Sequence, residues 1–411
     1  MLLSLLFGLF CWAKEISVGA LSNLLDLPTL EQEKRGLTFT PREIAQQPET
    51  WLKTMHLFQR EQQRIRSFLE AAGVTGPLES RPVVMLIGAG TSDFIGASLA
   101  LLLRQRWGCE VVAVASTDLL PSLSDYVVPG RRYLWISFSR SGDSPEGVHV
   151  LEQALDAYPE ISHLVVTCNP ESRMAELAAN RPRACIVVLD DTVNDRGLAM
   201  TSSFTNMVVL GQCLAHAWSF GEYEAILAQM IASAVLFLND SAALAPQMAA
   251  YARPRMCMIG SGSLSAVASE SALKVLEMSG GRVKTMPQTS LGLRHGPMAA
   301  LDRETDLICF LSSDRIRLRY EADLLREIQA KKITASCVVI GLEASRADVA
   351  PFCDLYHAIG GSFTDAYRPP VDVIFGQLLG LYSSIACGLR PDAPSPDGVI
   401  NRVVNDFAIY R

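Results

Sequence analysis

The stretch VVMLIGAGTSDFIGASLALLL, residues 83–103, decides the fold. Its first five residues form an unbroken apolar run that ends at Gly88, and Gly90 then precedes a second, longer apolar segment. A short continuous apolar run is typical of a strand that is buried on both faces, as in a parallel sheet. The stretch therefore predicts a strand, a glycine-rich turn and a helix, which together form the repeating unit of an α/β fold.

The same pattern occurs again in RMCMIGSGSLSAVASESALKVLE, residues 255–277. Because apolar strand patterns alternate with helical patterns in both halves, we expect an α/β protein with two tandem doubly wound lobes, each with a mainly parallel central sheet flanked by helices. A nearly constant offset between matching landmarks indicates an internal duplication. Three pairs show it: Gly88 and Gly260 are 172 residues apart, Ser139 and Ser312 are 173 apart, and Val166 and Val339 are 173 apart.

The predicted organisation has four parts. They are an N-terminal extension and arm over residues 1–52, a first lobe over 53–224, a second lobe over 225–390 and a C-terminal tail over 391–411. The chain starts with MLLSLLFGLFCWAKE, whose apolar run is too short to span a bilayer. The segment lacks the basic start and the small-residue cleavage site of an export signal, which favours a dispensable extension over a signal.

Composition excludes several classes of partner. The 411 residues are 49% hydrophobic and 19% charged, with a net charge of −7 and no long run of like charge. A nucleic-acid surface would need clustered Lys and Arg, so neither a nucleic-acid nor a membrane partner is predicted. The ten cysteines are scattered and none forms a C-x-x-C pair. They are expected to be buried thiols in a reducing, cytoplasmic compartment, with no disulfide and no metal site.

Hydroxyl side chains gather after the predicted strands of the first lobe, where ligands bind in open α/β sheets. The sequence Ser144-Pro145-Glu146 predicts a helix start, whose unpaired N–H groups favour an anion. The chain lacks both G-x-x-x-x-G-K-[ST] and G-x-G-x-x-G, so a small monophosphate fits better than a nucleotide. Ordinary turns and caps remain the alternative for any one cluster. The three clusters are Thr91 and Ser92; Ser139, Ser141 and Ser144; and Thr201, Ser202 and Ser203.

The second lobe lacks the serine pattern but contains ionisable groups. Glu270, Lys274 and Glu277 are spaced i, i+4 and i+7, so they share one helix face. Such a triplet is a surface ion-pair ladder or part of a site in a cleft. His295 lies in the predicted loop LGLRHGP, and with a lysine and a glutamate it would supply acid and base groups at neutral pH.

The motifs GAGTS, SFSRSGDSPE, ESALKVLE and RHGP resemble those of the SIS (sugar isomerase) family. Within it, the chain is most similar to the two-lobed galactosamine-6-phosphate deaminase/isomerase group, also called tagatose-6-phosphate ketose/aldose isomerases. The segments NDRGLAMTSSFT and GVINRVV resemble that group as well. The likeness runs from about Gly36 to the C-terminus. A more distant resemblance links the chain to the isomerase half of glucosamine-6-phosphate synthase.

The resemblance implies an enzyme that converts galactosamine 6-phosphate to tagatose 6-phosphate and ammonia without a metal or organic cofactor, and that forms a homodimer or higher homo-oligomer. A tagatose-6-phosphate ketose/aldose isomerase without deamination, and a sugar-phosphate sensor without catalysis, remain alternatives. A sensor is expected to lack Glu277 or His295, or to carry a DNA-binding domain, and this chain keeps both residues.

The resemblance also implies roles for individual residues. Glu277 matches the base that moves a proton between C1 and C2, and Lys274 matches its neighbouring lysine. His295 matches a histidine that assists ring opening, which in the synthase comes from the partner subunit. The spacing from Glu277 to His295 is about two residues longer than in the synthase. The synthase's C-terminal lysine has no clear match, so Arg402 is the nearest candidate in the tail. The sugar-phosphate loop is matched by Thr91, Ser92, Ser139, Arg140, Ser141 and Ser144.

Overall fold

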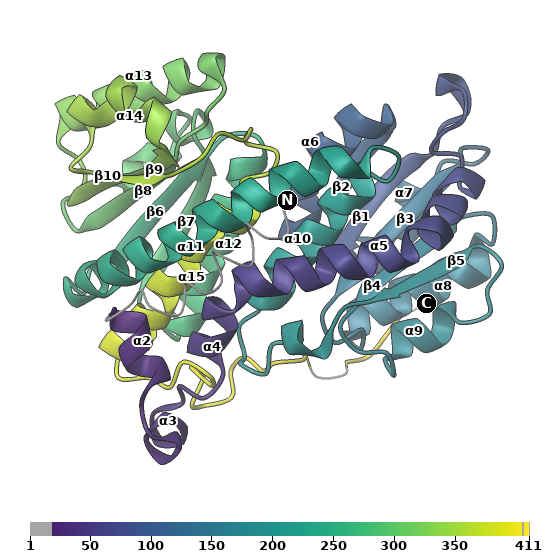
Figure 1. Ribbon diagram of the computed structural model, residues 1–411, viewed down its shortest axis with the longest axis horizontal. Coiled ribbons are helices and arrows are strands. Elements are labelled where there is room, and N and C mark those ends of the chain that lie inside the picture. Colours follow the sequence, from purple (N-terminus) through teal and green to yellow (C-terminus); the bar gives the residue numbers. More distant parts are fainter. Residues whose placement is uncertain (1–18, 405–406, 411) are drawn as a thin grey trace. The chain divides into compact units, whose positions relative to one another are not determined.

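A computed structural model describes residues 19–404 and 407–410 (Figure 1). The predicted dispensable extension lies outside the described residues. The chain divides into two compact units. Of the described residues, the first-lobe unit contains 49–195, 200–223, 400–404 and 407–410, and the second-lobe unit contains 19–48, 196–199 and 224–399.

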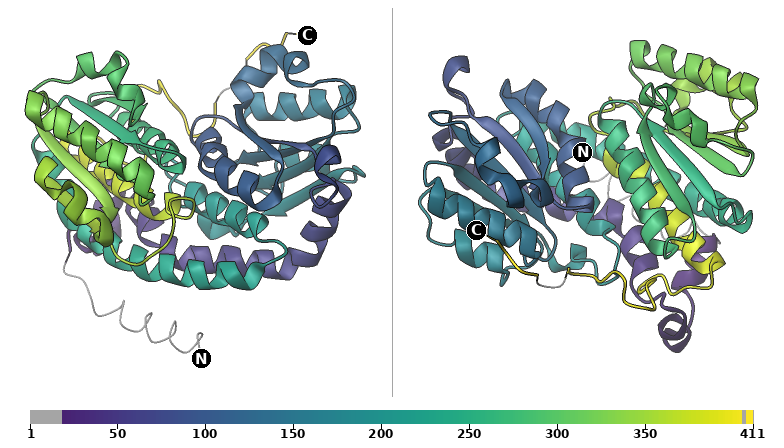
Figure 2. Two further views of the ribbon diagram at one scale, coloured as in Figure 1. Left: turned by 90° about the horizontal axis from the view of Figure 1, so that it is seen from above. Right: turned by 180° about the vertical axis from the view of Figure 1, so that it is seen from behind.

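The first-lobe sheet has five parallel strands in the order β2-β1-β3-β4-β5. The strands are β1 (Val83–Gly88), β2 (Glu110–Ala115), β3 (Tyr133–Ser139), β4 (Ser162–Thr167) and β5 (Ala184–Val188). Every residue of β1 and β3 is buried, as their continuous apolar sequences predict. Helices lie on both faces of the sheet (Figure 2). They are α5 (Gln47–Ala71), α6 (Thr91–Trp107), α7 (Ser116–Tyr126), α8 (Pro145–Ala157), α9 (Arg173–Ala178) and α10 (Ser202–Ala215).

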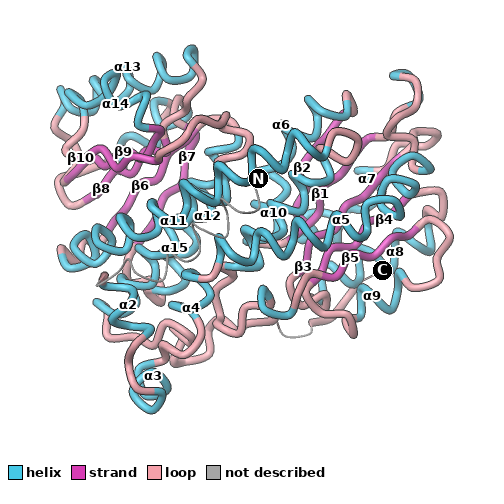
Figure 3. Tube along the Cα trace, in the orientation of Figure 1, coloured by secondary structure: helices cyan, strands magenta, loops and turns pink. Residues whose placement is uncertain are grey.

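The second-lobe sheet is also parallel and repeats the first in order, β7-β6-β8-β9-β10 (Figure 3). Its strands are β6 (Arg255–Gly260), β7 (Lys284–Thr289), β8 (Thr305–Phe310), β9 (Ser336–Leu342) and β10 (Leu355–Ile359). Its helices are α11 (Phe220–Ala250), which begins in the first-lobe unit, α12 (Ser263–Met278), α13 (Arg315–Lys331), α14 (Arg346–Val349) and α15 (Pro369–Ala386). The prediction of two tandem α/β lobes is confirmed.

The glycine-rich turns that defined the duplication have nearly the same conformation. Gly90 has φ 55° and ψ −123°, and Gly262 has φ 60° and ψ −131°. A side chain is strained at such dihedral angles, so glycine is needed at both positions. In each lobe the turn sends the chain from the first strand directly into the next helix, α6 or α12. The turns therefore place the N-termini of α6 and α12 at the carboxyl edges of their sheets.

The N-terminal arm belongs to the second-lobe unit. It contains α2 (Ala20–Leu25), α3 (Thr29–Arg35) and α4 (Thr40–Ala45). The carboxylate of Asp392, far along the chain, accepts backbone N–H groups from Thr38 at 2.7 Å and Thr40 at 2.8 Å. These bonds cap the start of α4 and hold the tail segment against the arm.

Two features bear on localisation. The nine cysteines of the described residues are all free and seven of them are buried, in agreement with the predicted thiols. Helix α11 is long and apolar enough to cross a membrane by length and composition alone, with a mean hydropathy of 1.5 over its most apolar window. This is weak evidence for a span, because core helices of soluble proteins meet the same criterion, and 44% of the window is buried in the protein.

Candidate active site

The serine loop of the first lobe, Ser139–Ser144, joins β3 to α8 as the sequence predicts. Helix α8 begins at Pro145 with Ser144 as its N-cap residue, but the Ser144 hydroxyl makes no capping hydrogen bond. The start of this helix thus leaves backbone N–H groups at the carboxyl edge of the sheet. Such a helix start favours a bound anion.

Hydrogen bonds inside the loop fix two of its hydroxyl groups. The Ser139 hydroxyl accepts the N–H of Gly142 at 3.0 Å, and the Ser141 hydroxyl accepts the N–H of Asp143 at 3.2 Å. Each hydroxyl accepts with its oxygen, so its proton remains able to donate to another group. The loop therefore holds its serines in place and keeps them as donors.

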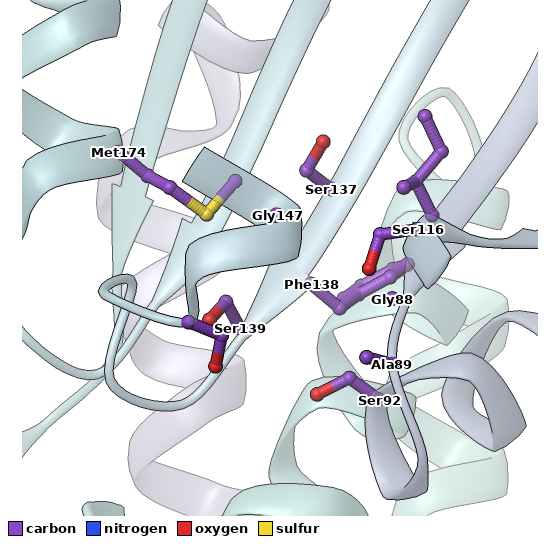
Figure 4. Close-up of a pocket in the computed structure, with 11 residues that line it drawn as sticks. Gly88, Ala89, Ser92, Ser116, Ser137, Phe138, Ser139, Gly147 and Met174 are labelled. Carbon is purple, nitrogen blue, oxygen red and sulfur yellow. The ribbon is translucent and has the colours of Figure 1, made fainter. Parts of the chain in front are cut away.

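A small cavity of about 30 Å³ lies beside this loop (Figure 4). The hydroxyl residues that line it lie on β3 or just after β1, β2 and β3, and Gly147 comes from α8; these residues are Ser92, Ser116, Ser137, Ser139 and Ser144. Among the described residues of the wall there is no charged side chain. The lining supplies neutral hydroxyl donors, which suit an oxyanion.

Two arginines predicted in the substrate site, Arg140 and Arg402, lie in the first-lobe unit, and one donates to the backbone of the other. Arg140 is buried, and its guanidinium donates to the backbone carbonyl of Arg402 at 2.6 Å. Arg402 in turn donates to the carbonyl of Asp195 and to Asn194 Oδ1, both at 2.8 Å. The tail is thereby attached to the serine loop. A direct substrate contact by either arginine stays a prediction.

The third hydroxyl cluster has a partner that the sequence analysis missed. The carboxylate of Asp195 accepts the backbone N–H groups of Thr201, Ser202 and Ser203 at 2.8–3.0 Å, together with the hydroxyl groups of Thr201 and Ser203. All three hydroxyl residues are fully buried at the start of α10. The cluster therefore holds an anion that belongs to the protein, which favours a structural role for Thr201 and Ser202. An acid a few residues before a Thr-Ser-Ser helix start was the available signal.

The remaining predicted residues of this lobe lie at the start of α6. Thr91 and Ser92 are both buried in its first turn, and the Ser92 hydroxyl lies 3.9 Å from the sulfur of Met200. Directly after β4, burial raises the pKa of the Cys168 thiol well above its ordinary value, with a further contribution from Asp195. A thiol with a raised pKa stays protonated at neutral pH, which makes Cys168 a poor nucleophile.

In the second lobe, Lys274 lies between two carboxylates on helix α12. Its ammonium nitrogen is 2.6 Å from Glu277 Oε2 and 3.5 Å from Glu270 Oε1. The side chains of Lys274 and Glu270 are 1% and 0% exposed, whereas that of Glu277 is 24% exposed. The surface-ladder alternative is therefore wrong. Glu277 is the member of the triplet that reaches solvent, and a buried lysine orients it.

Helix α15 holds α12 in this position through two glycines. A methyl group at Gly376 would overlap Ser271, and one at Gly380 would lie 3.0 Å from the backbone oxygen of Lys274. The two helices therefore approach closely along the segment that carries Lys274. Glu277 is one turn away from this contact, so its position depends on α15.

His295 lies outside this cluster. It follows a short helical turn, Gly292–Arg294, and its side chain is exposed. Within the described part of the chain, its imidazole has no hydrogen bond or ion pair. The structure thus brings Glu270, Lys274 and Glu277 together and leaves His295 facing solvent. Within the same described ranges, no group of three His, Cys, Asp or Glu side chains is placed to hold a metal ion.

No family model matches the sequence. Curated proteins similar to this chain include a candidate D-galactosamine-6-phosphate deaminase AgaS of Streptomyces coelicolor, which is 36% identical over 379 residues, or 90% of this chain and 95% of that protein. The D-galactosamine-6-phosphate deaminase AgaS of Escherichia coli O157:H7 is 33% identical over 382 residues, or 91% and 96% of the two chains.

Two solved structures are also similar. A tagatose-6-phosphate ketose/aldose isomerase of Escherichia coli has a TM-score of 0.79 and 31% identity, covering 88% of this chain and 95% of that one. A candidate tagatose-6-phosphate ketose/aldose isomerase of Clostridium novyi has a TM-score of 0.86 and 28% identity, covering 92% and 96%. The curated relatives are thus named as deaminases of galactosamine 6-phosphate, and the solved structures are named as isomerases of tagatose 6-phosphate.

Proposed function

This chain belongs to the SIS (sugar isomerase) family, in the group of the AgaS deaminases, and we propose that it converts D-galactosamine 6-phosphate and water to tagatose 6-phosphate and ammonia. The observation that carries the proposal is the Lys274–Glu277 pair, in which a buried ammonium holds a partly exposed carboxylate at 2.6 Å. A carboxylate fixed in this way is suited to remove a proton from a carbon atom of a bound substrate.

In the proposed reaction, His295 transfers the proton that opens the ring, and Glu277 acts on the proton of C2. His295 moves the proton of the anomeric hydroxyl to the ring oxygen, which opens the ring. Glu277 then takes the proton from C2 of the open aldose, and the electrons of that bond form an enolamine with C1. Return of the proton to C1 gives a ketose imine, which water hydrolyses to the ketose and ammonia. The aldehyde activates its own α-proton, so the chemistry needs neither a metal nor an organic cofactor.

The phosphate of the substrate is assigned to the first lobe. Ser139, Ser141 and Ser144 would donate hydroxyl protons to its oxygens, with Thr91 and Ser92 at the start of α6. The ordered loop hydrogen bonds support this assignment, because they fix the serine oxygens before a ligand arrives. Arg140 is part of the same loop, and Arg402 is attached to it. Thr201 and Ser202 are assigned to the support of α10 through Asp195.

Isomerisation without deamination is the second candidate, and it is favoured by the names of the two solved structures. Both reactions use the same base at C2, so they differ only in the group on that carbon. The deciding experiment measures ammonia and ketose 6-phosphate separately, with the 6-phosphates of galactosamine, glucosamine, N-acetylgalactosamine and galactose as substrates. We expect ammonia and tagatose 6-phosphate in equal amounts from galactosamine 6-phosphate. Turnover of galactose 6-phosphate alone would replace the deaminase proposal with the isomerase.

Replacing Ser141 by alanine is expected to weaken binding of the sugar phosphate about 2–10-fold, because one neutral hydrogen bond is lost, worth about 0.5–1.5 kcal/mol. Binding is measured by calorimetry with galactosamine 6-phosphate and, separately, with inorganic phosphate as a competitor. The control is Ser124→Ala, which removes an exposed hydroxyl from α7 of the same lobe. Equal affinities of both variants and the wild type would return the serine loop to a purely turn-forming role.

We also assign the protein to the cytoplasm and propose that it is a homodimer or a higher homo-oligomer. The described cysteines, all free and mostly buried, support a reducing compartment. The imidazole of His295 is exposed and has no hydrogen bond or ion pair among the described residues, which supports an assembly, since a proton-transfer group needs a substrate beside it. In this arrangement His295 would complete the site of a neighbouring subunit.

A further inference from the structure

In the second lobe, the carboxyl ends of three strands converge on one buried carboxylate. Glu321 projects from α13 and is 1% exposed. Its Oε1 accepts the hydroxyl of Ser290, which follows β7, at 2.8 Å, and its Oε2 accepts the N–H of Ser312, which follows β8, at 2.7 Å. Ser261, which follows β6, also hydrogen-bonds to this carboxylate. Each of the three donors thus comes from a different strand end.

The donors around Glu321 are chemically similar to those of the first-lobe cavity. Strands β6, β7 and β8 occupy the places in their sheet that β1, β2 and β3 occupy in theirs. In the first lobe, residues at the ends of β1, β2 and β3 line a cavity, and α8 with its N-cap residue contributes Gly147 and Ser144, neither of which is charged. In the second lobe, the helix that follows the third strand, α13, sends a carboxylate to the matching three strand ends.

The Glu321 carboxylate is held by neutral donors. Among the described residues it forms no ion pair, and its hydrogen-bond partners are two hydroxyl groups and one backbone amide. Burial raises the pKa of Glu321, while the hydrogen bonds from Ser261, Ser312 and Ser290 oppose this shift. Neutral donors that converge on an anion without a counter-charge are what a serine-based phosphate site offers.

The other hydroxyls of the same loop are also engaged with the protein's own acids. The hydroxyl of Ser312 donates to Asp365, and Ser313 donates to it through its hydroxyl at 2.7 Å and its N–H at 2.8 Å. Asp365 is in turn bonded to Arg368 at 3.3 Å. The loop after β8, which matches the serine loop of the first lobe by position in the sheet, therefore has internal carboxylates where a ligand would bind.

We propose that the second lobe retains an oxyanion-binding site and that Glu321 is its built-in ligand. The second-lobe site is accordingly filled by the protein itself and takes no sugar phosphate. When the side chain is removed, the three donors are left around a small space that accepts a small carboxylate. This inference rests on the duplication and on the contacts of Glu321, and it is independent of the activity proposed above.

The test is chemical rescue of Glu321→Ala, with thermal unfolding of the full chain as the readout. The variant is expected to unfold roughly 5–10 °C below the wild type, because buried donors lose their acceptor. Sodium formate is expected to restore a large part of this loss relative to sodium chloride at equal ionic strength. The matched control is Asp323→Ala on the same helix, whose carboxylate is exposed and paired with Arg326. Formate should have no specific effect on this control or on the wild type.

Glu321→Gln provides a second measurement if the alanine variant does not fold. It keeps the volume of the side chain but replaces one acceptor oxygen with an NH₂ group that faces other donors, so a clear loss of thermal stability is expected. Two outcomes would overturn the proposal. One is a Glu321→Gln protein as stable as the wild type, and the other is a folded Glu321→Ala protein that responds equally to formate and chloride.

Discussion

Glu277→Gln is expected to lower turnover of galactosamine 6-phosphate by about 10²–10⁴-fold while the protein still binds this substrate, because general-base catalysis contributes a factor of that size. Glutamine keeps the shape of the side chain and can still accept a hydrogen bond from Lys274, but it cannot remove a proton. The change should therefore lower kcat far more than it alters the dissociation constant. Steady-state kinetics and calorimetry with the same preparation measure both quantities.

The control for this variant is Glu343→Gln, which alters another i, i+3 ion pair of the second lobe. Glu343 bonds to Arg346 on the surface, with its side chain 58% exposed, so its loss should leave turnover unchanged. Exchange of the C2 proton in deuterated water, followed by NMR, isolates the step assigned to Glu277. If Glu277→Gln still exchanges this proton at the wild-type rate, Glu277 is not the base, and Glu270 on the same helix becomes the next candidate.

Mixing Glu277→Gln with His295→Asn subunits is expected to restore activity that neither variant has alone. If base and histidine come from different chains, each mixed dimer has one site with both groups intact and one with neither. Random exchange produces mixed dimers in half of the population, so about a quarter of wild-type activity should return. The measurement is ammonia release after co-incubation of the two purified variants.

A control for mixing pairs Glu277→Gln with the double variant Glu277→Gln/His295→Asn, from which no activity can return. Subunit exchange is followed separately with two affinity tags. If exchange is complete and activity stays at the level of the separate variants, the two groups act within one chain. The exposed position of His295 would then require a movement of its loop toward Glu277.

Much of the fold could be predicted from local sequence patterns. The run before Gly88 and its copy before Gly260 identified the first strand of each sheet, because a strand buried on both faces leaves a continuous apolar signature. The nearly constant offset predicted an internal duplication, and the two sheets indeed have matching strand orders. The helix start at Ser144 and Pro145 was equally local, since capping residues and proline act within one turn.

The partners of buried polar groups could not be predicted in this way. The hydroxyls of Thr201 and Ser202 gave the same sequence signal as those of Ser139 and Ser141. In the structure, however, the cluster of Thr201 and Ser202 surrounds Asp195. A sequence shows which groups can donate but not which acceptor the fold brings to them. The i, i+4, i+7 spacing predicted that Glu270, Lys274 and Glu277 share one face of a helix. It could not show that this face is buried, because the burial depends on α15, about 100 residues further along the chain.

The close approach of α12 and α15 is possible only because Gly376 and Gly380 have no side chain, so the position of the proposed base depends on these two glycines. A methyl group at Gly376 would overlap Ser271 and force the two helices apart, and one at Gly380 would crowd the backbone of Lys274, so either change would move the segment that carries Glu277. A shift of about 1 Å in a catalytic group can cost on the order of 10²-fold in rate. These two glycine positions are therefore expected to tolerate as little natural variation as Glu277 itself. A substitution there would lower activity by moving the base, although the residue is far from the substrate.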